Sequence, residues 1–208
     1  MPRLYDDIFT APKHFSQPRW TVFFLSWRLW SFTATLELHG VEKEYKPGEN
    51  FVKKDQISQK IAIVKKGLFR YYYLTGDGKE FTKVFMPEGS ILSAYSAMVS
   101  GTPSHFFIEA IEEATTVEIT FDTWKKLRAQ DAKWDMLLIA FLEKGYAVKE
   151  KREREFLFLD AEARYRQFLI DYLELEVRVT QRIIASYLGV PPIALSRIRR
   201  KMGLINLC

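Results

Sequence analysis

The segment from Val41 to Phe121 consists of short apolar runs separated by turn-forming residues, and this pattern limits the possible folds more than any other feature of the chain. The runs are rich in aromatic and β-branched residues, as strands are. Glycine and proline stand between them, as they do in turns. Many short strands at this spacing indicate a sandwich or jelly roll. The expected strands cover 61–64, 68–73, 81–85, 106–108 and 116–119, and residues 71–82 read as a hairpin.

The pattern then changes to one of helices. Trp134, Leu138, Phe141, Gly145 and Val148 follow spacings of four and three, which places them on one face of a helix. Two interpretations fit this stripe. It is the buried side of a surface helix that packs on the sheet, or it belongs to a long helix that pairs with its copy in a second subunit.

A boundary is expected at residues 156–160, where Asp160 can cap a new helix over 161–169. At the other end of the chain, the stretch 20–38 is apolar enough to suggest a membrane span. Arg28 lies at its centre, however, and a central arginine is costly in a bilayer. We therefore expect an amphipathic helix there and no membrane partner.

Residues 179–202 carry the most informative pattern. Thr180 can cap a helix whose inner face presents Ile184, Ala185 and Leu188. Gly189 suits a tight turn that needs a positive φ angle. The sequence therefore predicts a helix that ends in a sharp turn.

A second helix is expected to begin at Pro191 or Pro192, where a missing amide costs nothing. Leu195 and Ile198 face inward at a spacing of three. This is the layout of a helix-turn-helix, whose second helix enters the DNA major groove. The alternative is a helical hairpin with a solvated basic face. The residues expected to stay exposed are Ser196, Arg197, Arg199, Arg200 and Lys201.

The distribution of charge agrees with a nucleic-acid partner. The net charge is +5, and residues 178–201 contain six Lys or Arg residues and no Asp or Glu. The single cysteine, Cys208, cannot build a Cys-rich zinc site or a four-thiolate iron–sulfur cluster. The N-terminus lacks the basic start and apolar run of a signal peptide, so we expect a cytoplasmic protein.

These motifs resemble those of the Crp/Fnr family of bacterial transcription regulators (cyclic AMP receptor protein-like). The resemblance is specific at 184–200 and diffuse at 63–70, 76–80, 87–89, 108–110 and 160–165. It implies an α+β protein with a jelly-roll sensor domain over 1–125, whose N-terminal part is helical. A dimerisation helix over 126–158 and a helix-turn-helix domain over 159–208 follow, the latter with a reduced wing because few residues follow Lys201. The family also favours the dimer interpretation of the stripe.

The sensor segment departs from the members that bind cyclic AMP. Those carry Gly-Glu and, further on, Arg-Ser, which hold the ribose and the phosphate. The corresponding positions here are Ser93-Ala94 and Ser104-His105, so the carboxylate and the arginine are both missing. Without that arginine the phosphate loses a charge-assisted pair. We expect no tight binding of cyclic AMP, and these four residues remain the candidate effector pocket.

The second helix of the motif also departs from the family. Ile193-Ala194 stands where a Glu or Gln and then a Ser or Thr are common, and Ile193 can only touch a thymine methyl. Arg197 matches the base-reading arginine of the family, and the start of the first helix matches phosphate-contacting positions. The predicted DNA-binding residues are Thr180, Gln181, Pro192, Ile193, Ser196, Arg197, Arg199, Arg200 and Lys201.

The leading hypothesis is a dimeric regulator that binds double-stranded DNA, with an unidentified small-molecule effector and RNA polymerase as further partners. The second is an effector-binding or interaction module whose helix-turn-helix no longer reads DNA specifically. The third is a cupin-type enzyme on the same barrel. His14, His39 and His105 are too scattered for its metal site, and no nucleophile–base pair is visible. We expect a protein that is not an enzyme and carries no metal, haem or iron–sulfur cofactor.

Overall fold

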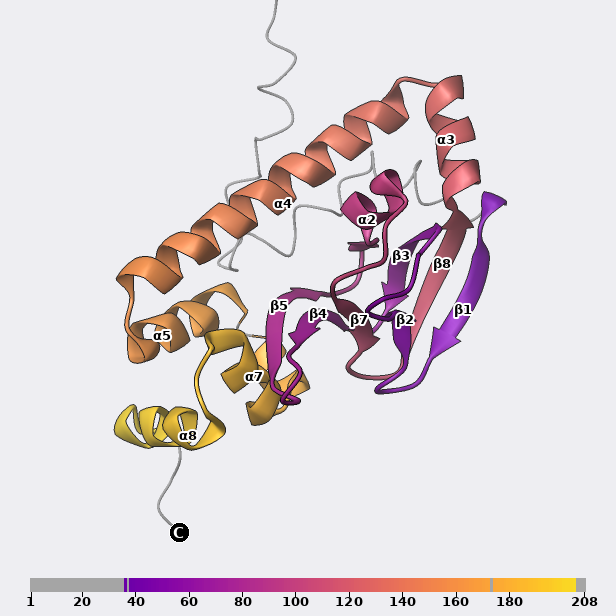
Figure 1. Cartoon of the computed structure of the whole chain (residues 1–208). Coiled ribbons are helices and arrows are strands. Elements are labelled where there is room, and N and C mark those ends of the chain that lie inside the picture. The colour runs from indigo at the N-terminus through magenta and orange to yellow at the C-terminus, as the bar shows by residue number, and fades with distance from the viewer. Residues whose placement is uncertain (1–35, 37, 173, 205–208) are drawn as a thin grey trace, which may run out of the picture.

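The computed structural model of the protein describes residues 36, 38–172 and 174–204 (Figure 1). Its strands are β1 (Val41–Tyr45), β2 (Asn50–Val52), β3 (Lys60–Lys66), β4 (Phe69–Leu74), β5 (Glu80–Met86), β6 (Ile91–Leu92), β7 (Phe107–Ala110) and β8 (Ala114–Thr120). They form two four-stranded antiparallel sheets. We call β1-β8-β3-β6 the β3 sheet and β2-β7-β4-β5 the β4 sheet. This is the strand arrangement of a jelly roll.

The space between the two sheets is filled by apolar side chains from both. Strand β3 explains why the sequence lacks a simple alternation here. Ala62 and Val64 face the opposite sheet, whereas Ile61 and Ile63 face outward and are also buried. A strand that is covered on both faces reads as a continuous apolar run. The five predicted strands correspond to β3, β4, β5, β7 and β8, and the expected mixture of helices and strands is confirmed.

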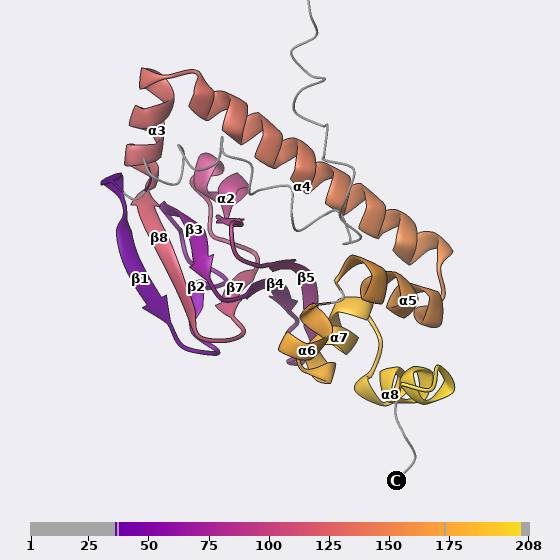
Figure 2. The same ribbon diagram turned by 180° about the vertical axis from the view of Figure 1, so that it is seen from behind.

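Helices cover the outer faces of both sheets. They are α2 (Tyr95–Ser100), α3 (Phe121–Gln130), α4 (Lys133–Phe158), α5 (Ala161–Asp171), α6 (Leu175–Arg178), α7 (Gln181–Leu188) and α8 (Pro192–Lys201). In both views α4 runs diagonally from α3 to α5, and the later helices gather at its far end, with α7 beside β5 (Figures 1 and 2). The helix predicted after Asp160 is confirmed as α5, because the Asp160 carboxylate accepts the Ala163 N–H at 2.8 Å.

The long helix expected over 126–158 begins later than expected, because α4 starts at Lys133 and residues 126–130 belong to α3. Asp131, between them, has an extended backbone. Its carboxylate accepts the N–H of Lys133 at 2.9 Å. A side-chain acceptor at this position satisfies a free amide of the new helix, so Asp131 separates α3 from α4.

The predicted stripe on α4 begins as a face buried in its own chain. Trp134 and Leu138 are buried with Trp124 and Leu127 on the outer side of the β3 sheet. The rings of Trp124 and Trp134 meet edge to face, with centroids 5.8 Å apart. Intramolecular packing is therefore the right interpretation for this end of the stripe, and any dimer contact there must use another face of α4.

The helices that follow α4 pack on the outer side of the β4 sheet. Leu68 and Phe85 from the jelly roll share one hydrophobic core with Phe168 of α5, Tyr187 of α7 and Leu195 of α8. The Phe85 ring lies 6.2 Å from that of Phe168 and 5.2 Å from that of Tyr187. The jelly roll and the C-terminal helices are thus joined by a continuous apolar core.

Within the described part of the chain, no helix is both long and apolar enough to cross a membrane. The stretch 20–38 lies outside that part except for residues 36 and 38. The amphipathic helix expected there stays a prediction. After α8, the described residues end at Leu204 without a further strand, so the reduced wing also stays a prediction.

Candidate nucleic-acid interface and effector pocket

Helices α7 and α8 are joined by the tight turn that the sequence predicts. The Thr180 hydroxyl accepts the Ile183 N–H and so caps α7. Gly189 has φ +69°, and a Cβ built there would lie 2.9 Å from the ring of Phe156. Pro191 precedes α8, which begins at Pro192. The positive φ favours glycine at position 189, and a Cβ there would also have to displace the end of the Phe156 ring.

One side of α8 is exposed along its length. Ile193, Ser196, Arg197 and Arg200 recur at spacings of three and four, and all four side chains are accessible. Ile193 is 69% exposed, whereas Leu195 on the opposite side is buried. Among the described residues, Arg197 and Arg200 form no ion pair. This side of α8 therefore presents two arginines and an apolar side chain to solvent.

The other two basic residues at the end of α8 have acidic partners. Arg199 is half-buried and pairs with Glu176 of α6, and it also donates to the Tyr165 hydroxyl at 2.7 Å. Burial and the hydrogen bond to Glu176 raise the pKa of Tyr165 to about 12. The expected exposure of Arg199 is therefore wrong, because its guanidinium joins α8 to α5 and α6. Lys201 is exposed, as expected, and pairs with Glu162 at 2.7 Å.

The arginines that precede α8 bind acidic residues of the jelly roll. Arg178 pairs with Glu88 and Glu112, and Arg182 pairs with Glu80 at 2.8 Å. Burial raises the pKa of Glu88, but the hydrogen bonds from Arg178 and two backbone amides outweigh it and leave the pKa below its ordinary value. The Arg178 pairs hold α6 on the jelly roll, and the more exposed Arg182 pair adds a weaker link to α7. Thr180 and Gln181, at the start of α7, stay exposed.

In the predicted effector pocket, Ser93 and Ala94 are buried beside a filled core. The Tyr71 hydroxyl accepts the Ser93 N–H at 2.9 Å and donates to the Ser93 carbonyl at 3.2 Å. Burial raises the pKa of Tyr71 well above its ordinary value, so the hydroxyl stays protonated. The Phe106 ring packs 5.2 Å from the Tyr71 ring. Tyr71 therefore occupies the backbone groups that a ligand at Ser93 would need.

The other two residues of the predicted pocket lie in a loop. Ser104 is buried, and its hydroxyl donates to the Phe106 carbonyl at 2.8 Å. His105, next to it, is exposed. Among the described residues, no hydrogen bond joins Ser104 or His105 to Ser93. The structure thus gives Ser104 a local role in the loop and turns His105 toward solvent.

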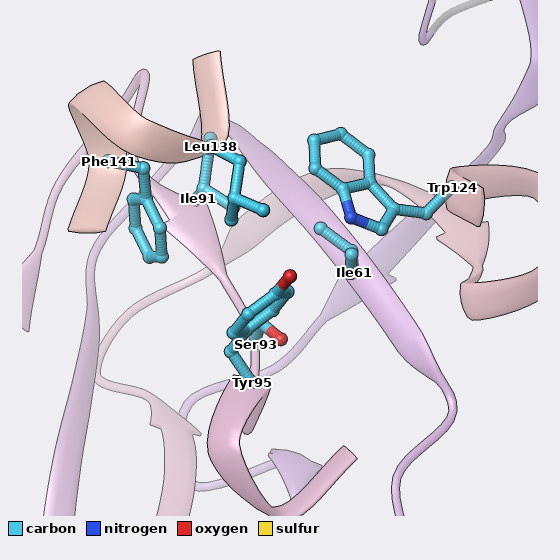
Figure 3. A pocket seen from close by; sticks show the side chains of 7 residues that line it. All are labelled: Ile61, Ile91, Ser93, Tyr95, Trp124, Leu138 and Phe141. Atoms are coloured by element: carbon cyan, nitrogen blue, oxygen red, sulfur yellow. The ribbon is translucent and has the colours of Figure 1, made fainter. Parts of the chain in front are cut away.

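A small cavity lies on the outer side of the β3 sheet, between the sheet, α3 and α4 (Figure 3). Its volume is about 10 Å³, enough for roughly one water molecule. Ser93 Oγ and Trp124 Nε1 are buried in its lining without a hydrogen-bond partner in the described structure. Ligand pockets measure about 300–1,000 Å³, so this cavity is far too small for a nucleotide. Its lining is Ile61, Ile91, Ser93, Tyr95, Trp124, Leu138 and Phe141.

Helix α4 carries a second apolar face that the described residues leave uncovered. Ile139, Leu142 and Tyr146 are spaced by three and four residues, and each is at least 45% exposed. Further along, Leu157 and Phe158 are still more exposed. A repeat of three and four residues matches the seam of paired helices. The predicted stripe missed this face, although the same spacing rule would have found it one residue further along the helix.

Comparisons with known proteins agree with this architecture. Residues 42–131 match the family model of the cyclic nucleotide-binding domain. No curated protein matches the chain. Among solved structures, the c-di-GMP-responsive global regulator CLP of Xanthomonas campestris has 16% identity and a TM-score of 0.72, over 86% of this chain and 95% of that one.

Two further solved structures are similar. FixK2 of Bradyrhizobium japonicum has 21% identity and a TM-score of 0.67, over 81% of this chain and 88% of that one. A Crp/Fnr-family regulator structure from Eubacterium rectale has 16% identity and a TM-score of 0.69, over 86% of each chain. The resemblance to Crp/Fnr regulators is confirmed for the fold. At these identities the structures show the fold alone.

Proposed function

We propose that this protein is a dimeric DNA-binding transcription regulator of the Crp/Fnr type. The observation that carries the proposal is the exposed side of α8, where Arg197 and Arg200 follow a tight turn and pair with no acid within the described part of the chain. A helix in this position can enter the major groove. Arginine there can donate two hydrogen bonds to guanine O6 and N7.

The residues divide into three roles: base contact, phosphate contact and holding α8 in place. We assign base reading to Arg197, and contact with thymine methyl groups to Ile193. Arg200 and the exposed start of α7, at Thr180 and Gln181, are assigned to phosphates, because such contacts position the protein without reading sequence. Arg199 is assigned to holding α8 on α6, since Glu176 already binds its guanidinium.

The dimer is proposed to form through the exposed face of α4. Burying Ile139, Leu142 and Tyr146 against their copies would remove a row of apolar side chains from water. In such a dimer, the two α8 helices would be related by its two-fold axis and would reach half-sites about 34 Å apart, one turn of DNA. An effector and RNA polymerase stay predictions.

The dimer is tested by sedimentation at equilibrium. Tyr146→Glu places a charge in the seam, and we expect it to shift the protein from dimer to monomer. Val99→Glu is the matched control, because Val99 is also exposed but lies on α2. A Tyr146→Glu protein that stays dimeric would require another interface.

We also propose that the jelly roll does not hold a cyclic nucleotide. The phosphate-binding arginine is missing at Ser104, and Tyr71 already bonds the Ser93 backbone. Calorimetric titration with cyclic AMP is expected to give no heat of binding at micromolar concentrations. Binding at those concentrations would overturn this part of the proposal.

The DNA proposal is tested by fluorescence anisotropy on fragments of the protein's own promoter region, at physiological salt with competitor DNA. We expect the wild type to prefer certain fragments. Arg197→Ala should lose about 1–3 kcal/mol of that preference, the usual cost of deleting a base-reading arginine. Lys126→Ala is the control, because it removes the same charge from an exposed position on α3.

A second candidate function rests on the paired basic residues. Four of the six Lys or Arg residues over 178–201 already bind acids of their own chain, and Ile193 offers no hydrogen bond. These features favour an interaction module that no longer reads sequence. Equal binding of the wild type and Arg197→Ala to every fragment, dependent only on salt, would select it.

A further inference from the structure

Strand β5 lies at the edge of the β4 sheet, and a side chain of α7 completes its hydrogen bonding. The Ser186 hydroxyl donates to the Glu80 carbonyl at 3.0 Å and accepts the Thr82 N–H at 2.8 Å. The Thr82 hydroxyl lies 3.0 Å from Ser186 Oγ as well. Open strand edges expose unpaired backbone groups, and Ser186 satisfies two of them here. The Ser186 hydroxyl thus bonds two backbone groups of β5 that a neighbouring strand would otherwise pair.

The Glu80 carboxylate continues this contact through charge. It lies between Arg70 and Arg182, with an N–O distance of 2.8 Å to each. Arg70 also binds Glu109, and its side chain is only 4% exposed. Arg182 is 73% exposed, so its pair contributes little by itself. The result is a row of alternating charges, Glu109–Arg70–Glu80–Arg182, that runs from β7 across β4 and β5 to α7.

Helix α4 joins the same junction through Arg152. The Arg152 guanidinium donates to the Thr82 carbonyl at 2.9 Å and to the Tyr187 carbonyl at 2.6 Å. It also lies 3.8 Å from the centre of the Tyr187 ring. One residue of β5 is therefore bonded to α7 through Ser186 and to α4 through Arg152. The proposed dimer helix, the jelly roll and the proposed DNA-binding helices meet at this point.

We infer that Ser186 and Glu80 form a latch that determines which half-site spacing the dimer accepts; this inference rests on the proposed function. If α4 forms the dimer, the latch fixes each α8 relative to the dimer axis. A pair of α8 helices held in this way fits half-sites about 10–10.5 bp apart, centre to centre, and penalises other spacings. Ser186 and Glu80 are positioning residues, because neither is on the exposed side of α8.

The test measures spacing preference directly. Wild-type protein first selects sites from a random-sequence DNA pool, and the best site is then remade with base pairs inserted or deleted at its centre. Anisotropy gives the affinity for each spacing. Ser186→Ala should reduce the preference for the original spacing by about 2- to 13-fold, the range that the net free energy of one hydrogen bond represents. Glu80→Gln should reduce it in the same direction but less, because the Arg182 side of its ion pair is exposed. Binding to an isolated half-site should not change.

Two matched controls accompany these variants. Ser96→Ala removes an exposed helical serine hydroxyl from α2, and Glu113→Gln removes an exposed carboxylate from the jelly roll. Both should keep the spacing preference of the wild type. Amide exchange gives an independent readout, because Ser186 accepts the Thr82 N–H. That amide should exchange faster in Ser186→Ala, while the amides of β3 and β8 stay protected.

The outcomes separate the two proposals. Specific, spacing-selective binding by the wild type and a weaker spacing preference in both variants supports the latch. The same binding by the wild type with an unchanged preference in both variants overturns the latch alone. A wild type that selects no sequence from the pool overturns the proposed function, and the latch falls with it.

Discussion

Phe85 is a buried contact between the jelly roll and the C-terminal helices. This side chain is 3% exposed, and its ring meets those of Phe168, Tyr172 and Tyr187. Phe85→Ala would leave a cavity where these three rings converge. Truncating a buried phenylalanine costs about 3–5 kcal/mol, through lost transfer free energy and the remaining cavity.

The free energy lost in Phe85→Ala decides which part of the chain unfolds first. The helices after residue 159 form a unit shorter than the roughly 70–80 residues below which a single core seldom supplies more than a few kcal/mol. A loss of about 3–5 kcal/mol exceeds what such a unit can spare, whereas the jelly roll keeps its own core between the sheets. Phe85→Ala should therefore unfold the C-terminal helices first and leave the jelly roll folded.

The assay is urea unfolding followed by two probes. All five tryptophans precede residue 135, so their fluorescence reports the N-terminal part of the chain, whereas far-ultraviolet circular dichroism also reports the late helices. In the wild type the two transitions should coincide. In Phe85→Ala the dichroism should change at lower urea, and the amides of α5 and α7 should exchange faster.

Phe51→Ala is the control. Phe51 is 2% exposed and lies in the core between the sheets, away from the late helices. Its truncation should lower the stability of the whole chain while the two transitions stay together. Coincident transitions in Phe85→Ala, with unchanged exchange in α5 and α7, would refute the claim that this core holds the helices in place.

Three further predictions follow from single contacts. Gly189→Ala should lower the melting temperature, because it combines a positive φ with a Cβ 2.9 Å from Phe156, and a loss below about 0.5 kcal/mol would contradict that packing. Tyr71→Phe should cost about 1–3 kcal/mol in urea unfolding, since it leaves the buried Ser93 N–H without its partner, and a neutral result would show that water replaces the hydroxyl. Arg178 helps to lower the pKa of Glu88, so the pair stabilises the fold at neutral pH, and this stabilisation is lost as the pH falls through the lowered pKa. Glu88→Gln should therefore lower the free energy of unfolding at pH 7 but not at strongly acidic pH. An equal loss at both pH values would argue against the pair.

The elements of this fold were largely predictable because their signals are local. The hairpin around Gly76 and Gly78, the Asp160 cap and the Gly189 turn each follow from residues close together in the sequence. Helix α4 shows the limit of such signals. Two apolar faces run along it at similar spacings, and only the structure shows that Trp134 belongs to the face that packs on its own sheet.

The candidate site was predictable in its position but not in its pairings. The exposure of Arg197 follows from its place on an amphipathic helix. The burial of Arg199 does not, because its partner Glu176 is on α6, a helix that the sequence pattern does not reveal. Ser186 likewise reads as an ordinary polar position of α7, although it is bonded to a strand 104 residues away. Long-range pairings of this kind leave no periodic trace in the sequence.

Strand β4 links the filled core to the latch, because neighbouring residues on a strand face opposite sides. Tyr71 points into the jelly roll and bonds Ser93, while Arg70 points outward and binds Glu80. A rearrangement of β4 that withdrew the Tyr71 hydroxyl from Ser93 would also displace the Arg70 guanidinium, and with it the carboxylate that meets Arg182. A ligand that bound only the rearranged core would shift the population of docked α7 by its differential affinity for the two states. If β4 has two such arrangements, ligand binding in the jelly-roll core and the docking of α7 are coupled through this strand.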